Sequence, residues 1–506
     1  MKKNLIKVTI ILSILLLTLI PLSVNAATYG DMTYTISNNE ITITDCNTSV
    51  TEIVIPSKIE NIPVTKIGKE AFRDCSLLES IKLPNSIIEI GEYAFYDCTN
   101  LPMITLPNNL KKIGDHAFCR CFNLFKVNIP PSVEEIGPYA FGLCESLYSI
   151  EIPANTTKIG INAFWCCSSL QSVKLNEGIT EIPIAMFDGC TSLSNINFPN
   201  TLLTIGDQAF EDCSRLKIVN LPPDLKSYGT AFRESGIEQI TLPESLTELG
   251  QFTQCYNLKS IKIPNGITSI DAFAFFMCTS LEKIEIPPSV KTIGRGQAET
   301  FGYCTNLKEV HISDIKAWSS IIFDNPYSNP LLYAKKLYLN GDLVENLVIP
   351  DGSTKISTYA FLNCTSLKNV TLPKSILYIQ TDAFKGCNYI QTMIYKGTKS
   401  QFEEVLVYSG NDYLKNATKT YLGMDIKTEK KDKDFIVTPT NVPNGSIIIF
   451  VCYNDKKMVY LEPFTYAGEE NKTFTPDKEY DTAKVFVWKN LEILKPLCEA
   501  EEVQLN

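Results

Sequence analysis

One pattern of apolar and polar positions recurs along most of the chain, with copies 23 residues apart. The copy that begins at Leu78 reads LESIKLPNSIIEIGEYAFYDC, and apolar and polar residues alternate in it from Ser80 to Leu83. A period of two is typical of a strand that is buried on one face. Pro84 ends this strand, because proline has no N–H to donate to a neighbouring strand.

The second half of the pattern predicts a bend and a turn. Ile87 and Ile90 form another short inward-facing segment. Gly91 follows, and we expect it to take a positive φ, since glycine does so without steric cost. Ala94 and Phe95 then begin a short helical or 3₁₀ turn that closes the coil.

Phenylalanine marks that turn in thirteen copies, and in twelve of them a cysteine follows three residues later. No single coil can bury its own apolar side, so the coils must stack and share one core. The predicted fold class is a repeat solenoid, mainly β with short 3₁₀ turns and a face of parallel strands. The phenylalanines are Phe72, Phe95, Phe118, Phe141, Phe164, Phe187, Phe210, Phe232, Phe252, Phe275, Phe301, Phe361 and Phe384, and the cysteines are Cys75, Cys98, Cys121, Cys144, Cys167, Cys190, Cys213, Cys255, Cys278, Cys304, Cys364 and Cys387.

Written LxxIxLPxSIxxIGxxAFxxC, this unit resembles the repeat of the BspA-like leucine-rich repeat family. Residues 310–350 are similar to a lengthened coil inside such proteins, and residues 394–421 resemble their terminal coil. The resemblance spans about 27–422. It implies a leucine-rich-repeat solenoid in a secreted or surface-displayed protein and, for some members, adhesion to host matrix proteins.

The N-terminus predicts export from the cell. Two lysines precede an apolar run from about Leu5 to Ile20, and small residues follow at a spacing that suits cleavage. This order predicts a secretory signal peptide over residues 1–26, with an uncleaved membrane anchor as the alternative. We therefore expect a secreted or cell-surface protein with no transmembrane segment in the mature chain.

Four further segments follow from the pattern. Residues 27–66 are expected to form an N-terminal capping region, and residues 67–423 the leucine-rich-repeat solenoid. Residues 424–434 are charged and lack apolar periodicity, which predicts a linker. Residues 435–506 predict a small immunoglobulin-like β-sandwich, because strand-like runs alternate there with turn signals. These runs are Phe435–Thr440, Ser446–Tyr453, Met458–Phe464, Lys472–Thr475 and Lys484–Lys489. The ending AKVFVWKNLEILKPLCEAEEV resembles C-terminal modules of exported proteins from clostridia-like bacteria.

Charge and side-chain chemistry narrow the classes of function. The chain carries 46 Lys+Arg against 56 Asp+Glu, which argues against a nucleic-acid partner because such binding needs a basic footprint. Only His116 and His311 are present, and no nucleophile elbow, HExxH motif or phosphate-binding loop occurs. Spacing alone leaves a carboxylate pair for glycoside hydrolysis open. We predict a protein that is not an enzyme and that has no cofactor and no metal site. His116 aligns with Tyr93 and Tyr139 of the neighbouring coils, which predicts a column of polar and aromatic residues.

The seventeen cysteines allow two interpretations in an exported protein. Each cysteine of the repeat has two equivalent neighbours, so nothing selects a disulfide partner for it. The period therefore favours a column of small, soft core residues at the turn. Cys452 and Cys498 share the C-terminal domain, and whether they pair is left open.

The first strand of each coil predicts the binding surface, because it exposes two residues per coil. These positions are rich in Asn, Ser, Thr and Lys. Phe125 and Tyr148 lie one coil apart at the rim of this face, beside Pro102. A sugar groove usually has flat aromatic platforms, and the central columns have none, so a protein ligand is favoured over a glycan. The candidate ligand-binding residues are Lys82, Thr105, Phe125, Lys126, Asn128, Tyr148, Glu151, Lys174, Asn195 and Asn197.

Three hypotheses about function follow. The first is a secreted or cell-surface protein that binds a protein, such as one of the host or its extracellular matrix, through the exposed strand face. The second is a structural component of an envelope or matrix whose contacts run from solenoid to solenoid. The third, and least favoured, is a hydrolytic or glycan-processing enzyme that uses the solenoid as a substrate platform.

Overall fold

The computed structural model describes residues 26–296, 299–468, 471–488 and 501–503. The chain divides into two compact units. The first consists of Met1–Glu285 and Gly294–Leu307. The second consists of Ile286–Ile293 and Lys308–Asn506.

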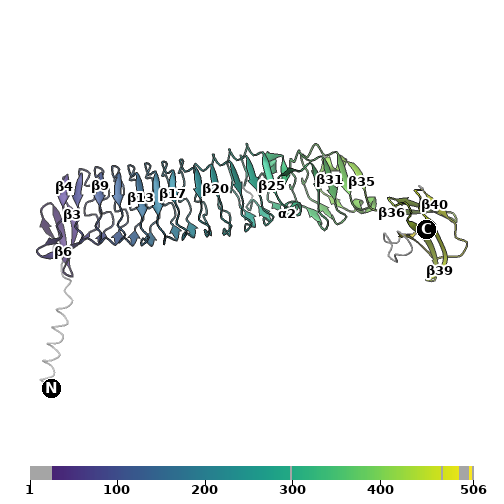
Figure 1. The fold of residues 1–506 in the computed structure, drawn as a ribbon, viewed down its shortest axis with the longest axis horizontal. Helices are drawn as coiled ribbons and strands as arrows, with labels where there is room; N and C mark the ends of the chain where they lie inside the picture. Colours follow the sequence, from purple (N-terminus) through teal and green to yellow (C-terminus); the bar gives the residue numbers. More distant parts are fainter. Residues whose placement is uncertain (1–25, 297–298, 469–470, 489–500, 504–506) are drawn as a thin grey trace, which may run out of the picture. The chain divides into compact units, whose positions relative to one another are not determined.

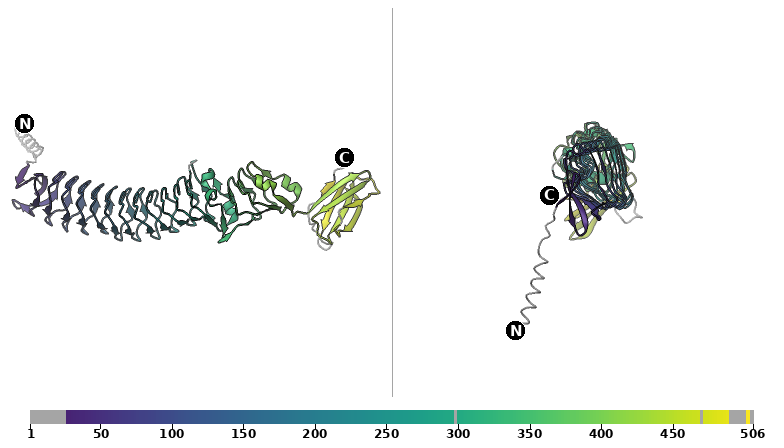
Figure 2. Two further views of the ribbon diagram at one scale, coloured as in Figure 1. Left: turned by 90° about the horizontal axis from the view of Figure 1, so that it is seen from above. Right: turned by 90° about the vertical axis from the view of Figure 1, so that its left-hand side faces the viewer.

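In the first unit, coils follow one another in a row, and each contributes a strand to the first side of the core (Figure 1). Many coils add a shorter strand to a second sheet on the other side of the core, and Figure 2 shows the same row from another direction. The strands on the first side are β4 (Glu52–Val54), β7 (Ser80–Lys82), β9 (Met103–Thr105), β11 (Lys126–Asn128), β13 (Ser149–Ile152), β15 (Ser172–Leu175), β17 (Asn195–Asn197), β19 (Ile218–Asn220), β20 (Gln239–Thr241), β21 (Ser260–Lys262) and β23 (Lys283–Glu285). These strands pair in several short sheets, such as β9 with β11 and β13 with β15 and β17, and together they are called the first sheet. The strands on the second side are β6 (Ile62–Ile67), β8 (Glu89–Ile90), β10 (Lys112–Ile113), β12 (Glu135–Ile136), β14 (Lys158–Ile159), β16 (Glu181–Ile182), β18 (Thr204–Ile205) and β22 (Ser269–Ile270).

The pairing is parallel and in register with the repeat. Lys112 of β10 pairs with Glu89 of β8, and Lys126 of β11 pairs with Met103 of β9. The polar residues of these four strands point outward, while the isoleucine or valine beside each of them is buried. The predicted repeat solenoid with parallel strands is therefore confirmed.

An antiparallel arrangement precedes the coils. The strands β1 (Ala27–Tyr29), β2 (Met32–Ser37) and β3 (Glu40–Cys46) form a meander, and β3 then pairs in parallel with β6. A short strand, β5 (Lys58–Ile59), folds back on β6. Met32, Ile41 and Ile43 of this meander are buried, so it adds apolar cover at the first coil.

The segment that follows the second strand is a series of hydrogen-bonded turns and neither a 3₁₀ nor an α-helix. Tyr93 and Asp97 have φ values of 54° and 62°, and left-handed residues of this kind interrupt a right-handed helix. The N–H groups of these residues and of Phe95 donate to the next coil, where the Phe95 nitrogen lies 2.7 Å from the Ala117 oxygen. Hydrogen bonds between residues three apart in the sequence, such as the one from the Cys98 N–H to the Phe95 oxygen, close the turn within its own coil. The turns therefore hold neighbouring coils together as the sheets do.

The glycine of the repeat is needed for close approach, and the prediction of a positive φ was wrong. Gly91 does not lie in the left-handed region, which Tyr93 occupies instead. A Cβ atom on Gly91 would lie 2.8 Å from the backbone of Gly68, and one on Gly114 would lie 2.6 Å from Gly91. Glycine is required because each coil passes directly against the backbone of the preceding coil.

Stacked phenylalanines fill the core of the first unit. The rings of Phe72 and Phe95 lie 5.0 Å apart and 6° from parallel, and the stack continues through Phe118, Phe141 and Phe164. Each ring is fully buried. Such a ladder is possible because every coil presents the same ring at the same height.

A column of cysteines runs beside the phenylalanines, as predicted. The Cys98 thiol donates to the Phe72 carbonyl oxygen at 3.1 Å, and Cys121 makes the equivalent contact with Phe95. The sixteen cysteines within the described residues are free thiols. Cys498 lies outside the described residues, so its pairing with Cys452 stays untested.

Helices interrupt the coils of the second unit in two places. The lengthened coil holds α2 (Ile315–Ser320), η1 (Pro326–Ser328) and α3 (Leu331–Ala334), and its Trp318 donates to the Ala360 oxygen at 2.8 Å. The terminal coil holds α4 (Lys399–Glu403) and α5 (Asp412–Asn416). The strands of these coils are β24 (Thr292–Ile293), β25 (Glu309–Ile312), β26 (Ile322–Phe323), β27 (Leu337–Leu339), β28 (Asp342–Leu343), β29 (Asn346–Val348), β30 (Lys355–Ile356), β31 (Asn369–Leu372), β32 (Tyr378–Ile379), β33 (Thr392–Tyr395), β34 (Leu406–Val407) and β35 (Thr418–Tyr421).

The C-terminal part is a small β domain with two antiparallel sheets. One sheet has the order β36-β37-β40 and the other β39-β38-β41-β42. Phe435 of β37 packs on Phe450 of β38, with 4.9 Å between ring centroids, so the two sheets face each other across an apolar core. The strands are β36 (Asp425–Lys431), β37 (Asp434–Thr440), β38 (Ile447–Asn454), β39 (Lys457–Thr465), β40 (Lys472–Phe474), β41 (Thr482–Trp488) and β42 (Glu501–Val503).

The prediction of a linker at 424–434 was wrong. Residues 425–431 form β36, which pairs with β37 over its whole length, from Asp425 opposite Thr440 to Lys431 opposite Asp434. Ile426 is the buried side chain of this strand, and Lys427 and Glu429 are exposed. Main-chain hydrogen bonds therefore hold a charged segment at the edge of a sheet, where charge is well tolerated.

Candidate functional site

The predicted binding residues lie on the first-sheet side of the first unit, and strand register brings most of them together. Glu151 of β13 lies beside Lys174 of β15, and Lys174 lies beside Asn197 of β17. Successive strands of a parallel sheet are about 4.8 Å apart, so side chains at the same register position form a continuous column. All ten predicted residues are exposed.

A shallow depression of about 740 Å³ lies on this face between β11 and β17. Six of the predicted residues line it, and Phe125 and Tyr148 lie at the rim beside it. Lys82 on β7 and Thr105 on β9 lie outside the depression, toward the N-terminal coils. The polar residues that line it are Lys126, Asn128, Ser149, Glu151, Ser172, Lys174, Asn195 and Asn197.

The charges in the depression are partly neutralised. The Lys174 ammonium lies 2.8 Å from a Glu151 carboxylate oxygen, and the Asn176 amide donates to the same oxygen at 2.9 Å. The hydrogen bond from Lys174 and that from Asn176 lower the pKa of Glu151. Lys126 forms no ion pair within the described part of the chain. The depression therefore presents one uncompensated positive charge among amides and hydroxyls.

Apolar side chains form an exposed patch at the rim. Phe125 is 48% exposed and Tyr148 is 55% exposed, and the Tyr148 N–H donates to the Phe125 oxygen at 3.3 Å, so they lie on adjacent coils. Met103 of β9 is 48% exposed as well. Exposed aromatic and methionine side chains next to a polar depression are typical of protein interfaces.

The sequence-based site missed three of these residues. Ser149 and Ser172 line the depression, and Met103 belongs to the apolar patch. All three occupy outward positions of the first strand, so the repeat pattern already marked them as exposed. Their small or flexible side chains gave no chemical signal that would have selected them.

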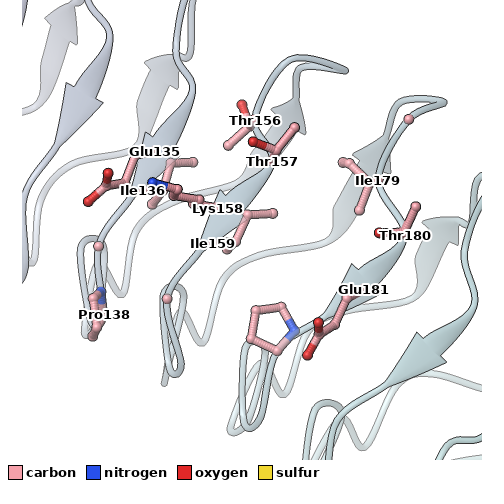
Figure 3. Close-up of a pocket in the computed structure, with 14 residues that line it drawn as sticks. Glu135, Ile136, Pro138, Thr156, Thr157, Lys158, Ile159, Ile179, Thr180 and Glu181 are labelled. Atoms are coloured by element: carbon pink, nitrogen blue, oxygen red, sulfur yellow. The ribbon is translucent and has the colours of Figure 1, made fainter.

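A second hollow, of about 400 Å³, lies on the second-sheet side, and the sequence prediction did not include it (Figure 3). Its walls come from three consecutive coils that carry β12, β14 and β16. The signal for it is a departure from the repeat, because Pro183 stands where neighbouring coils have glycine.

The predicted polar-aromatic column is present on the turn side. The His116 ring lies between Tyr93 and Tyr139, with centroid distances of 4.6 and 4.8 Å. Burial lowers the pKa of His116, so the neutral ring is favoured. Among the residues that the structure describes, no group of three His, Cys, Asp or Glu side chains could hold a metal ion, and no helix is long and apolar enough to cross a membrane.

The 23-residue coil, its two parallel sheets and its column of buried leucines and isoleucines define a leucine-rich-repeat solenoid. The chain belongs to the BspA-type leucine-rich repeat family, because the model for the BspA type leucine rich repeat region, in six copies, matches residues 42–168, 135–251, 180–308, 228–329 and 334–420. The resemblance inferred from the repeat is thus confirmed.

One solved structure supports the same fold, and two others are similar in sequence. A leucine-rich repeat protein from Bacteroides ovatus is 25% identical, with a TM-score of 0.51, and the match covers 78% of this chain and 99% of that one. A leucine rich cell surface protein from Faecalibacterium prausnitzii is 24% identical, with a TM-score of 0.38, and the match covers 76% and 98% of the two chains. A leucine-rich repeat protein from T. pallidum is 32% identical, with a TM-score of 0.36, and the match covers 38% of this chain and 91% of that one. No curated protein matches the chain.

Proposed function

We propose that this chain is an exported binding protein that recognises a protein ligand on the exposed face of its first sheet. The observation that carries the proposal is the coincidence of three features between β9 and β17. A depression lined by amides, hydroxyls and one unpaired lysine adjoins an apolar rim, and all of it is held on a rigid stack of strands. Protein interfaces combine an aromatic anchor with a polar surround in this way.

Export rests on the sequence. The segment 1–26 has the order of a signal peptide, and residues 1–25 lie outside the described part of the chain. Display outside the cell agrees with the printed name of the Faecalibacterium protein, which is a cell surface protein. We further propose that the C-terminal β domain is immunoglobulin-like and acts as a spacer, and that residues 27–66 cap the solenoid.

The anchor residues provide the first test. The full-length chain is immobilised and exposed to host surface and matrix extracts, the captured protein is identified, and its affinity is then measured by titration. Phe125→Ala with Tyr148→Ala should weaken binding at least tenfold, because loss of buried aromatic anchors commonly costs about 2 kcal/mol or more. Tyr303→Ala is the matched control, because Tyr303 is 53% exposed but lies away from the depression.

A second variant tests the polar part of the same surface. Replacing Lys126, Asn128, Glu151 and Lys174 together by alanine should weaken the same interaction. Unchanged affinity in both variants would place the binding site elsewhere. If the solenoid instead serves as a structural component, the purified chain should elute as an oligomer whose size depends on concentration, whereas a monomer peak agrees with a binding protein.

A further inference from the structure

The second sheet of the first unit is interrupted between β14 and β16, and Pro183 explains the interruption. In neighbouring coils a glycine at this position donates its N–H to the preceding coil, as Gly160 and Gly206 do at 2.8 Å. Pro183 has no N–H, so the Ile159 carbonyl lacks the donor that its equivalents have. β14 is accordingly the last strand of one sheet, and β16 begins another.

A second hydrogen bond between the coils is missing at the same place. In the next coil the Leu203 N–H donates to the Thr180 oxygen at 2.9 Å. The equivalent bond, from the Thr180 N–H to the Thr157 oxygen, is not formed. The edge of β14 therefore presents two main-chain carbonyls, at Thr157 and Ile159, that face the hollow without their usual donors. Open strand edges of this kind readily pair with another main chain.

The alternation of charges along the second sheet also breaks here. Lys112 of β10 pairs with Glu135 of β12 at 2.9 Å, and the same alternation would pair Lys158 of β14 with Glu181 of β16. No ion pair joins Lys158 and Glu181 in the described part of the chain, and both are exposed residues that line the hollow (Figure 3). An acidic group beside β14 would restore the alternation.

The hollow is bounded at both ends and bordered by apolar side chains. The Asn176 N–H donates to the Ile152 oxygen at 3.2 Å on one side, and the Asn162 N–H donates to the Ile184 oxygen at 3.1 Å on the other. The open edge between these bonds accommodates about four extended residues at roughly 3.3 Å each. Ile161 and Ile184 directly follow the lining residues Gly160 and Pro183, and their side chains are 46% and 48% exposed.

We propose that this hollow is a second binding site, separate from the strand face, for a short acidic peptide segment in extended conformation. Main-chain N–H groups of the peptide donate to the Thr157 and Ile159 carbonyls, as in strand addition to a sheet edge. An acidic side chain of the peptide pairs with Lys158, and an apolar side chain rests on Ile161 and Ile184.

The chain itself supplies the sequence of a suitable probe. In the intact sheet, residues 88–91 place the Ile88 N–H 2.8 Å from the Thr65 oxygen and the Gly91 N–H 2.8 Å from the Ile67 oxygen. The carbonyls of Thr65 and Ile67 are the repeat equivalents of the two open carbonyls of β14. Ac-Ile-Glu-Ile-Gly-NH2 should therefore bind the full-length chain in a calorimetric or fluorescence titration. The same peptide with lysine in place of glutamate, or with both donating nitrogens methylated, should bind at least tenfold more weakly.

Variants of the chain decide between this site and non-specific adsorption. Pro183→Gly restores the missing N–H and should both raise the Tm and weaken peptide binding at least tenfold. Pro153→Gly, at the end of the first strand in the preceding coil, is the control and should leave binding unchanged. Lys158→Glu should reverse the preference between the acidic and the lysine peptide.

Equal binding of all three peptides, no binding of the acidic peptide, or undiminished binding to Pro183→Gly would each overturn the proposal. The strand-face variants Phe125→Ala and Tyr148→Ala should not affect this binding, so the two sites are tested independently.

Discussion

A cysteine thiol is suited to its place in the repeat for reasons of size and proton affinity. The site is closed, apolar and next to a carbonyl of the preceding coil, so a small side chain with one weak donor fits it. Burial raises the pKa of Cys255 to about 12, which keeps the donating proton on sulfur at any physiological pH. In the coil of Phe232 the equivalent residue is Ser235, whose hydroxyl donates to the Phe232 oxygen of its own coil at 2.6 Å.

Gly114 gives a direct test of why glycine recurs in the coil. A Cβ atom there would lie 2.6 Å from the backbone of Gly91, and backbone cannot move aside as a flexible side chain can. We expect Gly114→Ala to lower the free energy of unfolding by about 1–3 kcal/mol, which is the usual cost of overpacking. Gly142→Ala is the control, because its nearest contact is 3.4 Å and its φ is not positive. Equal stability of the two variants in urea denaturation would refute close approach as the cause.

Asp188 should make the stability of the solenoid depend on pH. Burial, with repulsion from Glu211 and Asp212, raises the pKa of Asp188 to about 6 from an ordinary value of 3.8. The folded chain therefore holds this proton more tightly than the unfolded chain, and its stability falls as the pH rises from about 4 to 6. Above pH 6 the partly buried carboxylate is charged and destabilises the folded chain by its full amount.

The measurement is Tm against pH for the wild type and for Asp188→Asn. The variant should be more stable at pH 7 and should lose the part of the slope that lies between pH 4 and 6. Asp224→Asn, at an exposed aspartate of another coil, should leave the slope as it is. A slope that persists in Asp188→Asn would assign the dependence to other carboxylates.

At the scale of strands, the sequence predicted correctly those strands that bury one face in the core and expose the other. The alternation around Lys126 and Asn128 placed β11 correctly, because a period of two fixes which residues face the core. It failed at β36, because a strand held mainly by main-chain bonds carries no such alternation. The edge position of that strand, which its charges now explain, could not be known before its partner was known.

Departures from the repeat were harder to interpret than the repeat itself. A glycine at position 91 is compatible with a positive φ or with close approach of the neighbouring backbone. The residue type alone does not distinguish these two reasons for glycine. Pro183 is a single change within an otherwise regular coil, yet it removes one donor and ends a sheet. The effect of Pro183 depends on the Ile159 carbonyl of the preceding coil, which loses its donor. The sequence of the Pro183 coil alone does not identify that carbonyl.

At the scale of the whole molecule, the repeat explains both how much was predictable and why the ligand was not. Buried positions are fixed by the need to stack, so Phe95 or Leu78 is dictated by its neighbours in the adjacent coils. Exposed positions such as Asn195 and Asn197 are not constrained by stacking, so any ligand is encoded in their combination across coils. That combination became visible only when the strand register was known.

The ladder of phenylalanines makes the solenoid a nearly one-dimensional structure, in which each coil is stabilised by its two neighbours. Phe141 stacks on Phe118 at 5.2 Å and on Phe164 at 5.3 Å, whereas Phe72 begins the ladder and stacks on Phe95. Both rings are fully buried, so the burial lost on truncation is similar. We expect Phe141→Ala to cost about 3–5 kcal/mol, and Phe72→Ala to cost about 1 kcal/mol less because one stacking contact fewer is lost. Urea denaturation followed by circular dichroism measures both values. A cost for Phe72→Ala equal to or greater than that for Phe141→Ala would show that interaction between adjacent coils does not set the stability of the ladder.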